Sequence, residues 1–260
     1  MILYTKDNKG AVRSWEIERD DHDIVLRYGV LGGSIQERRE FVPYGKAGRT
    51  LDEQIALQIN SRISKQRDRG YVDTIEETKK GVTNQLGLVK PMLAQRLDRV
   101  SVNLDDVTVQ MKYDGNRCLI TKQNGLIIPY SRNGKIIAAD LSHITDGISL
   151  DEGQTIDGEL YSHGHKLQTI VSWIKRDQPD TRKLKFHAYD IINNEDYSER
   201  ARALLDIIGD NKHAEVVPMF KASGIEQVHR HHKFAVGQGY EGTIVRIPGY
   251  GYETGKRSRS

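Results

Sequence analysis

The stretch Val109-Gln-Met-Lys-Tyr-Asp-Gly-Asn-Arg-Cys118 lies near the middle of the 260-residue chain and runs a strand-like pattern into a glycine turn. From Val107 onward, apolar and polar residues alternate, and this period of two is typical of a β-strand. One face then carries Val107, Val109 and Met111, and the other carries Thr108, Gln110 and Lys112. The Lys112 side chain is therefore predicted to point to the polar face at the end of the strand, beside a turn formed by Asp114 and Gly115.

A lysine amine at such a turn has two interpretations. As a covalent nucleophile, Lys112 would be helped by partial desolvation and by the nearby cation of Arg117, because both favour the neutral amine. As a structural residue, Lys112 would be a surface lysine beside an Asp-Gly turn, which is a common arrangement. Taken alone, the stretch favours the structural interpretation.

The composition excludes several classes of protein. The 39 basic and 36 acidic residues nearly balance, so any binding of nucleic acid must come from local patches. The single cysteine, Cys118, excludes an internal disulfide framework and a cysteine-based zinc cluster. No apolar run has membrane-spanning length, and the polar start is not a secretory signal. We therefore expect a soluble, monomeric protein of the cytoplasm of a bacterium or of a virus-infected host cell.

Residues 1–42 predict a small antiparallel sheet, because short runs rich in aromatic and β-branched residues are separated by turn residues. These runs lie at 3–4, 14–17 and 24–28. A helix follows, since Thr50 is a candidate N-cap and Glu53 stands at the spacing of a capping box. Apolar residues then recur every four positions, at Leu51, Ile55, Ile59 and Ile63. The helix, predicted to end near Gly70, can therefore pack one face on the sheet.

Residues 1–76 resemble a WGR domain. The resemblance rests on Arg27-Tyr-Gly-Val-Leu-Gly-Gly-Ser-Ile-Gln36, on the helix that follows and on Gly70-Tyr71. Members of that family pack a small sheet on one helix and commonly bind DNA ends or breaks, which implies a DNA contact at Tyr28. Tyr28-Gly-Val30 stands where the family has Trp-Gly-Arg, so the contact of that arginine is in doubt. The alternative is a generic α/β appendage in which Tyr28 only builds a strand end.

A change in composition over residues 77–88, from acidic to basic and then to polar with glycines, predicts a linker. Residues 89–260 would then form a second domain. Its predicted strands lie at 107–112, 118–122, 126–131, 155–161, 184–192 and 242–247, and its predicted helices at 165–176, 197–208 and 224–236. Because several strands join through tight turns, an α+β fold of antiparallel sheets flanked by helices is expected rather than a doubly wound parallel sheet.

Four later segments each place charged or aromatic side chains at the end or along one face of a strand. They are Tyr130-Ser-Arg-Asn-Gly134, Thr155-Ile-Asp-Gly-Glu-Leu-Tyr161, Lys185-Phe-His-Ala-Tyr-Asp-Ile-Ile192 and Tyr240-Glu-Gly-Thr-Ile-Val-Arg246. Each segment alone could be a turn, a core tyrosine or a solvated loop charge. In this order, and after the Lys112 stretch, they resemble the motif set of the covalent nucleotidyltransferases. The ends of the domain, Lys90-Pro-Met-Leu-Ala94 and Lys256-Arg-Ser258, point to the ATP-dependent DNA ligases within that superfamily.

The resemblance implies a role for each matched residue. Lys112 would attack the α-phosphate of ATP and form a lysyl-AMP intermediate. The nucleotide would be bound by Gln110 through its backbone at the base edge, by Arg117, Arg132 and Arg246, by Glu159 at the ribose, and by Tyr189 stacked on adenine. Glu241 and Glu159 would hold Mg²⁺, for which carboxylates are natural ligands. Arg257 would contact DNA, and the substrate would be nicked duplex DNA.

Two departures limit the resemblance. The family's last motif, a Lys-x-Lys strand, and the OB-fold domain after it would lie beyond Ser260, so we expect a truncated ligase with slow or absent adenylylation. Arg246 stands where many relatives carry lysine. Two alternatives stay open: an RNA ligase or a capping enzyme that uses GTP, and a DNA-end-binding module without chemistry.

Overall fold

The computed structural model describes residues 1–7, 10–79 and 88–258. The chain separates into two compact units, Met1–Leu88 and Val89–Ser260. This division falls at the end of the linker predicted at 77–88. Within that stretch, Glu77–Lys79 form a short 3-10 helix (η1) and Leu88 is buried, whereas residues 80–87 lie outside the described part of the chain.

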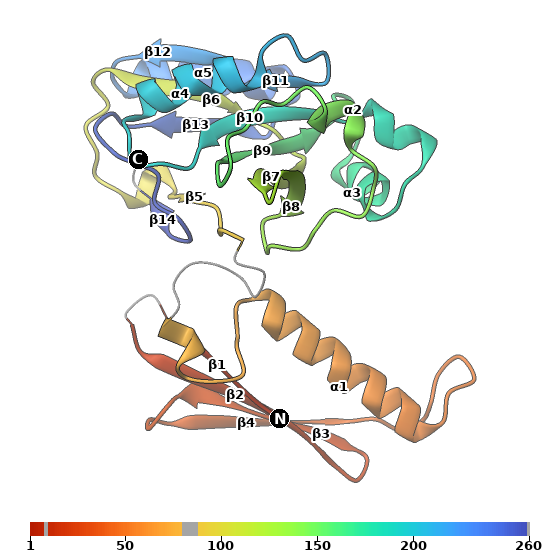
Figure 1. The fold of residues 1–260 in the computed structure, drawn as a ribbon. Coiled ribbons are helices and arrows are strands. Elements are labelled where there is room, and N and C mark those ends of the chain that lie inside the picture. Colours follow the sequence, from red (N-terminus) through yellow and green to blue (C-terminus); the bar gives the residue numbers. More distant parts are fainter. Residues whose placement is uncertain (8–9, 80–87, 259–260) are drawn as a thin grey trace. The chain divides into compact units, whose positions relative to one another are not determined.

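The first unit is an antiparallel four-stranded sheet with one long helix (Figure 1). Its strands follow one another in sequence order: β1 (Ile2–Lys6), β2 (Val12–Asp20), β3 (Asp23–Val30) and β4 (Ile35–Phe41). The helix α1 spans Leu51–Asp68. Its apolar stripe packs on the buried side chains of the sheet, with Ile55 almost fully enclosed. The sheet and helix predicted for this region are therefore present, and β4 is an additional strand.

The capping box at the start of α1 is present as predicted. Thr50 Oγ1 accepts a hydrogen bond from the Glu53 amide at 3.3 Å, and Glu53 Oε2 accepts one from the Thr50 amide at 2.8 Å. Replacing Thr50 by alanine should lower the free energy of unfolding of this unit by about 1 kcal/mol, because amide groups of the first turn lose their acceptor. Urea unfolding would measure this change, and Thr50→Ser, which keeps the acceptor, is the control. Equal stability of the two variants would show that the box contributes nothing.

The described residues of the second unit form three sheets. The largest has the order β11-β10-β9-β7-β8, the second has the order β12-β6-β13, and a short parallel pair joins β14 to β5. The strands are β5 (Leu93–Ala94), β6 (Val107–Lys112), β7 (Asn116–Gln123), β8 (Leu126–Ser131), β9 (Thr155–Tyr161), β10 (Lys185–Ile191), β11 (Ala214–Val216), β12 (Met219–Ala222), β13 (Gly242–Arg246) and β14 (Arg257–Ser258). Except for the β10–β11 and β5–β14 pairs, all pairings are antiparallel. The predicted α+β class is therefore confirmed.

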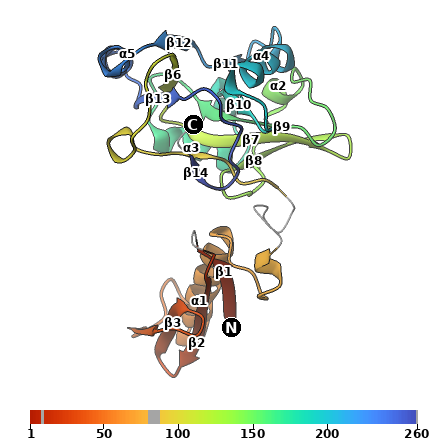
Figure 2. The ribbon, with the colours of Figure 1, turned by 90° about the vertical axis from the view of Figure 1, so that its left-hand side faces the viewer.

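Helices cover the sheets and close the core. They are α2 (Ser142–Thr145), α3 (Leu167–Lys175), α4 (Tyr197–Ile208) and α5 (Ile225–Gly237), with 3-10 turns η2 (Leu97–Arg99) and η3 (Pro179–Lys183). Figure 2 separates the sheet of β6 and β13, beside α5, from the larger sheet, beside α4. The main cluster of buried apolar residues lies around the larger sheet, and a smaller one, including Val107 and Val109, lies between β6 and α5.

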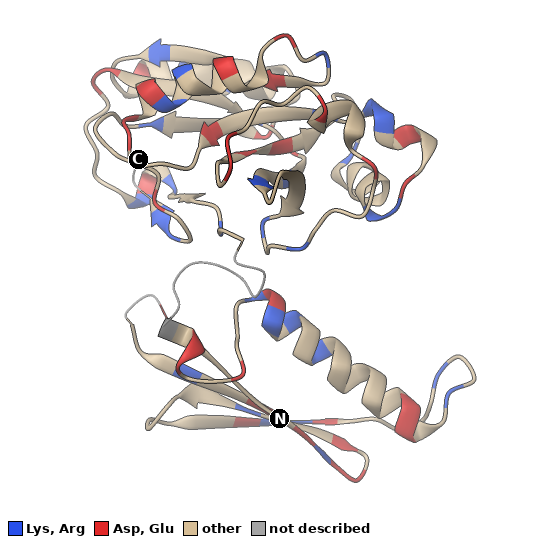
Figure 3. Cartoon of the chain, in the orientation of Figure 1, with Lys and Arg blue, Asp and Glu red and all other residues tan. Residues whose placement is uncertain are grey.

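Charge is mixed over both units rather than gathered on one face (Figure 3). On the sheet of the first unit, Arg27 pairs with Glu18 and Glu37, and Arg39 pairs with Asp20 and Glu37. This pattern agrees with the near balance of basic and acidic residues in the sequence. Across the described residues, the helices are all too short or too polar to span a lipid bilayer.

Candidate active site

Lys112 is the last residue of β6, and the pairing of β6 with β13 places Glu241 beside it. Gly242 of β13 lies opposite Lys112, and the Glu241 amide donates to the Lys112 carbonyl at 3.0 Å. The two side chains form an ion pair between Lys112 Nζ and Glu241 Oε1. Both are partly open to solvent, at 40% for the lysine side chain and 47% for the glutamate. The backbone of the sheet therefore sets the Lys112 amine against a carboxylate.

The turn after Lys112 needs glycine at position 115. A Cβ atom built on Gly115 would lie 2.4 Å from the Leu160 carbonyl oxygen and 2.8 Å from Glu159 Cγ. The chain then enters β7, in which Arg117 lies directly opposite Glu159 of β9. The close approach at Gly115 thus brings the Lys112 turn and the Arg117–Glu159 pair to the same end of the two sheets.

Tyr189 is directed by an irregularity in β10. The pairing of β10 with β9 runs from Ala188 opposite Gly158 to Asp190 opposite Asp157, so Tyr189 is the extra residue of a β-bulge. A bulge re-aims the side chain it carries. Here it turns a tyrosine that is only 2% exposed towards the cavity. The sequence predicted the strand but not the bulge.

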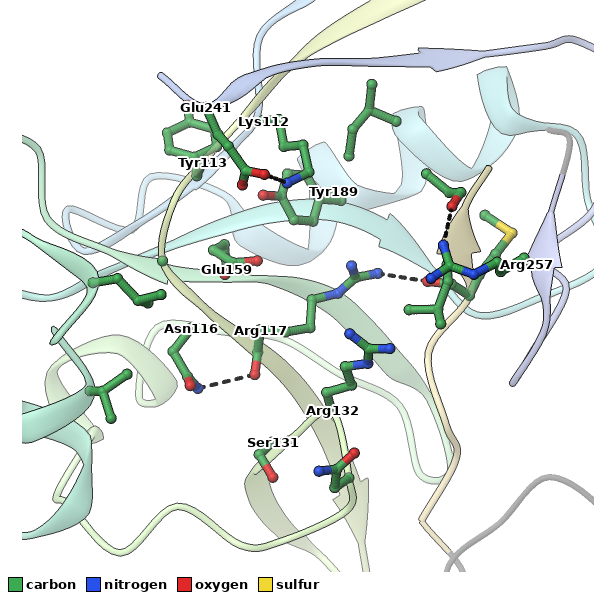
Figure 4. A pocket seen from close by; sticks show the side chains of 18 of the residues that line it. Lys112, Tyr113, Asn116, Arg117, Ser131, Arg132, Glu159, Tyr189, Glu241 and Arg257 are labelled. Carbon is green, nitrogen blue, oxygen red and sulfur yellow. Dashed lines mark hydrogen bonds and ion pairs between the residues drawn. The ribbon is translucent and has the colours of Figure 1, made fainter. Parts of the chain in front are cut away.

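A cavity of about 580 Å³ collects most of the predicted site residues. Its lining includes Lys112, Arg117, Arg132, Glu159, Tyr189, Glu241, Arg246 and Arg257. Figure 4 shows Lys112, Glu241 and Tyr189 together on one side, Arg117 and Arg132 extending the same way on the other, and Glu159 between them. Gln110 does not line the cavity, and Tyr28 belongs to the first unit.

The Arg117 guanidinium is bound by a carboxylate and a backbone carbonyl. Its Nε and Nη2 donate to the Asp157 carboxylate at 2.6 and 2.5 Å, and Nη2 also donates to the Met92 carbonyl at 3.2 Å. Lys112 itself is paired with Glu241 and 40% exposed. The partial desolvation expected for the amine agrees with this exposure, and an effect of the Arg117 charge on Lys112 stays a prediction. Arg117 is half-buried, is paired with the buried Asp157 carboxylate and lines the cavity.

Gln110 and Arg246 are hydrogen-bonded to each other at the cavity, which Arg246 lines and Gln110 does not. Gln110 lies in the central strand of its sheet, between Met219 and Ile244, and is fully buried. Its Oε1 accepts a hydrogen bond from Arg246 Nε at 3.1 Å, and Arg246 Nη1 pairs with Asp190 at 3.0 Å. Polar alternation predicted an open face at Gln110, but the Arg246 side chain covers it. The Gln110 Oε1 is therefore satisfied within the fold, and the contact of the Gln110 backbone with the edge of the base stays a prediction.

Asp190 is shared by two arginines. Besides Arg246, it accepts hydrogen bonds from Arg200 Nε at 2.7 Å and Nη2 at 3.2 Å, and all three side chains are almost fully enclosed. Paired carboxylates and guanidinium groups are the usual way to bury charge. Asp190 was quoted from the sequence without a role. Its contact with Arg246 ties β10, which carries Tyr189, to β13, which begins directly after Glu241.

Glu159 has an unusual electrostatic environment for a carboxylate. Burial raises the pKa of Glu159 to about 8, although the Arg117 charge acts in the opposite direction. The side chain is 8% exposed and none of the hydrogen bonds seen in the described residues involves its carboxyl group. At neutral pH, the protonated form of Glu159 is therefore favoured, and it can both donate to and accept from a ligand hydroxyl.

Arg132 and Arg257 complete the basic side of the cavity. Arg132 is exposed, and among the described residues it makes no hydrogen bond or ion pair. Arg257 belongs to β14, and its Nη1 donates to the Ala94 carbonyl at 2.9 Å. Together with Arg117 they can bind phosphate groups, for which the guanidinium geometry is well suited.

A metal ion at this cavity would need ligands from a bound nucleotide as well as from the protein. Within the described residues, no group of three or more His, Cys, Asp or Glu side chains could hold a metal ion. Glu159 and Glu241 are the carboxylates that line the cavity. Mg²⁺ commonly uses one or two carboxylates together with substrate phosphates and water. The residues present therefore fit Mg²⁺ bound with a phosphate ligand, and do not form a protein-only metal cage.

The Lys112–Glu241 pair should contribute little to stability. Because both side chains are substantially exposed, replacing Glu241 by glutamine is expected to change the free energy of unfolding by less than about 1 kcal/mol. Thermal unfolding of the two proteins would measure this. A larger loss of stability would mean that the pair holds the end of β6 in place.

The arrangement is that of a known enzyme family. The sequence model for the ATP dependent DNA ligase domain matches residues 91–260, well over half of the chain. The chain belongs to this family. The predicted resemblance to ATP-dependent DNA ligases is thereby confirmed for the second unit, while the WGR resemblance of the first unit stays a prediction.

Curated relatives of this ligase domain are also DNA ligases. The DNA ligase of Methanothrix thermoacetophila is 27% identical over 212 residues, which are 71% of this chain and 38% of that protein. The DNA ligase of African swine fever virus is 27% identical over 194 residues, which are 68% of this chain and 46% of that protein. The chain thus spans less than half the length of these two relatives.

Solved structures share the fold of the ligase domain. A structure of a Lig E DNA ligase matches with a TM-score of 0.55 and 22% identity, over 65% of this chain and 66% of that chain. The adenylate form of the Chlorella virus DNA ligase matches with a TM-score of 0.54 and 22% identity, over 68% and 64%. The bacteriophage T7 ligase in complex with ATP matches at 0.52 and 18%, over 65% and 66%.

Proposed function

We propose that the chain is the nucleotide-activating part of a ligase that uses ATP to seal nicks in duplex DNA. The observation that carries the proposal is the convergence of Lys112 with Glu159, Glu241 and four arginines on one cavity of a domain from the ATP-dependent DNA ligase family. A primary amine, carboxylates and guanidinium groups are the groups that phosphoryl transfer to a lysine requires.

In the proposed reaction, the neutral Lys112 amine attacks the α-phosphorus of ATP. A phosphorus–nitrogen bond forms, the bond to the pyrophosphate oxygen breaks, and the amine gives up a proton. The AMP group then passes from Lys112 to the 5′-phosphate at a nick, and the 3′-hydroxyl displaces AMP to close the strand. Lys112 must leave its ion pair with Glu241 and lose a proton before its nitrogen can attack phosphorus, because only the neutral amine has a free electron pair.

The nucleotide would be held by the walls of the cavity. Tyr189 offers a ring for stacking on adenine, and Glu159, buried beside it, suits the ribose hydroxyl groups. Contact with the edge of the base is proposed for the Gln110 backbone and the end of β6, where Lys112 and Tyr113 line the wall. Arg117 and Arg132 would hold phosphate or ribose.

Mg²⁺ would be held by Glu241 and Glu159 together with phosphate oxygens of the nucleotide. When bound, it would neutralise charge on the phosphates. The Glu241 carboxylate would then have two alternative partners, Mg²⁺ and Lys112, because it pairs with Lys112 in the absence of a ligand. Binding of the metal with nucleotide would therefore compete with this pair and release the amine.

The DNA would be contacted by both units. Arg257, at the rim of the cavity, is proposed to bind the DNA backbone, as its exposed position on β14 allows. The first unit is proposed to act as a WGR-like module for DNA ends, which its single sheet and single helix fit. Tyr28 is half-buried against the core of that unit, so any DNA contact uses only its exposed edge. The protein would act as a monomer.

Transfer of label from nucleotide to protein tests this proposal. Incubation with Mg²⁺ and ATP labelled at the α-phosphate should give an acid-labile protein adduct, and unlabelled ATP should suppress it better than GTP. Preference for GTP would favour a capping enzyme. Nick binding without an adduct under any condition would favour a module that only binds DNA ends.

A further inference from the structure

The segment 249–258, here called the C-terminal strap, crosses the wall of the cavity and is fixed at several points. The Tyr250 carbonyl accepts from Arg200 Nη1 at 2.9 Å, and the Leu93 amide donates to the Lys256 carbonyl at 2.8 Å. Between these points lies Tyr252, which is 6% exposed and whose amide donates to the Asn193 carbonyl at 3.0 Å. The strap therefore carries one buried tyrosine into the region behind the cavity.

The hydroxyl of Tyr252 bridges two distant parts of the domain. It donates to Asp157 Oδ2 at 2.5 Å and accepts from the Met92 amide at 2.9 Å. Burial and the charge of Asp157 raise the pKa of Tyr252 well above its ordinary value, so the proton stays on the phenol. Met92 also contacts Arg117, because its carbonyl accepts a hydrogen bond from Arg117 Nη2.

Asp157 links the Tyr252 hydroxyl to Arg117 through hydrogen bonds to both. The Asp157 carboxylate is fully buried and binds Nε and Nη2 of Arg117. In the described part of the chain, Nη1 of Arg117 has no hydrogen-bond partner, and Arg117 lines the cavity. One face of the guanidinium also lies over the Tyr189 ring, with Cζ at 5.5 Å from the ring centre. The network thus leaves one edge of Arg117 for a ligand and fixes the direction of that edge.

We propose that Tyr252 is a positioning residue for the adenylylation of Lys112: its hydroxyl holds Asp157, and Asp157 aims the free edge of Arg117 at the nucleotide. This inference rests on the proposed function. A phenylalanine at position 252 keeps the ring and removes only the hydroxyl. Asp157 then loses one of its donors, and the Arg117 fork can rotate. The effect appears in the binding of the nucleotide and not in the attack of the amine.

The test compares Tyr252→Phe with the unaltered chain, measuring KM and kcat for adduct formation with ATP and Mg²⁺ and the dissociation constant for ATP by calorimetry. We expect KM and the dissociation constant to rise about tenfold, the size of effect expected when a hydrogen bond to a charged group is lost, and kcat to change less than about threefold. Tyr130→Phe is the matched control. The Tyr130 ring is buried, and its hydroxyl donates to the Val89 carbonyl at 3.2 Å, three residues before Met92, which the Tyr252 hydroxyl contacts. That control should leave KM unchanged.

A double substitution separates positioning from a general structural effect. Arg117→Lys keeps a cation for Asp157 but lacks the planar fork, so adding Tyr252→Phe to it should raise KM no further. A full additional tenfold rise, or a loss confined to kcat, would overturn the inference. If the unaltered chain forms no adduct, the proposed function fails, and the calorimetric comparison still decides the inference: an unchanged dissociation constant in Tyr252→Phe contradicts it.

Discussion

Arginine in place of Lys112 should reduce the transfer of AMP to the protein by at least about a thousandfold, because the guanidinium stays protonated and has no free electron pair for attack on phosphorus. The charge is kept, so the ion pair with Glu241 can persist and the fold should be unaffected. The measurement is the rate of label transfer from ATP labelled at the α-phosphate, with binding of ATP followed separately by calorimetry.

Lys122→Arg is the matched control for this substitution. Lys122 lies on β7, and its Nζ donates to the Leu150 carbonyl at 3.0 Å, away from the residues that line the cavity. This variant should keep full label transfer. If Lys112→Arg accepts label as fast as the control, the nucleophile is another residue.

Glutamine in place of Glu159 should stabilise the protein at alkaline pH and weaken its binding of nucleotide. The pKa of Glu159 is about 8 in the folded chain, against an ordinary value of 4.5. The folded state therefore binds a proton that the unfolded state has released between these values, and stability falls as pH rises through this window. At pH 8 the buried carboxylate should cost on the order of 4 kcal/mol, which Glu159→Gln removes.

The comparison needs two pH values. At pH 4 both proteins carry a neutral side chain at position 159, so their free energies of unfolding should be nearly equal. At pH 8 the variant should be the more stable, with a difference that chemical denaturation can measure. Calorimetry should show weaker binding of ATP by the variant, because an amide replaces the carboxyl proposed to hold the ribose. A variant less stable at pH 8 would mean that the Glu159 carboxylate is satisfied in the fold.

Local patterns predict most of the regular structure. Alternation located β6 at Val107–Lys112, and the Thr50–Glu53 spacing located the start of α1. Strands of two to four residues, such as β5, β11 and β14, were missed because so short a run carries no measurable period. The parallel pairing of β14 with β5 depends on residues more than 160 positions apart in sequence.

The residues that line the cavity could be predicted from the sequence, but the buried residues that hold them in place could not. Ordered motifs identified the residues that converge on the cavity, from Lys112 to Glu241. The partner of each buried charge was not visible in the sequence, because it depends on long-range contacts. The hydroxyl of Tyr252, 95 positions from Asp157, lies in a loop without a motif, and the bulge at Tyr189 has no glycine to mark it. Asp157 and Asp190 carried a signal only in so far as both stand inside quoted segments.

The most direct test of the account is to locate the AMP group on the protein. After incubation with ATP and Mg²⁺, proteolysis under conditions that preserve the phosphorus–nitrogen bond and mass spectrometry of the peptides should place one AMP on Lys112. An AMP group on any other residue, or a chain that binds ATP and stays unmodified, would contradict the assignment of Lys112 as the nucleophile.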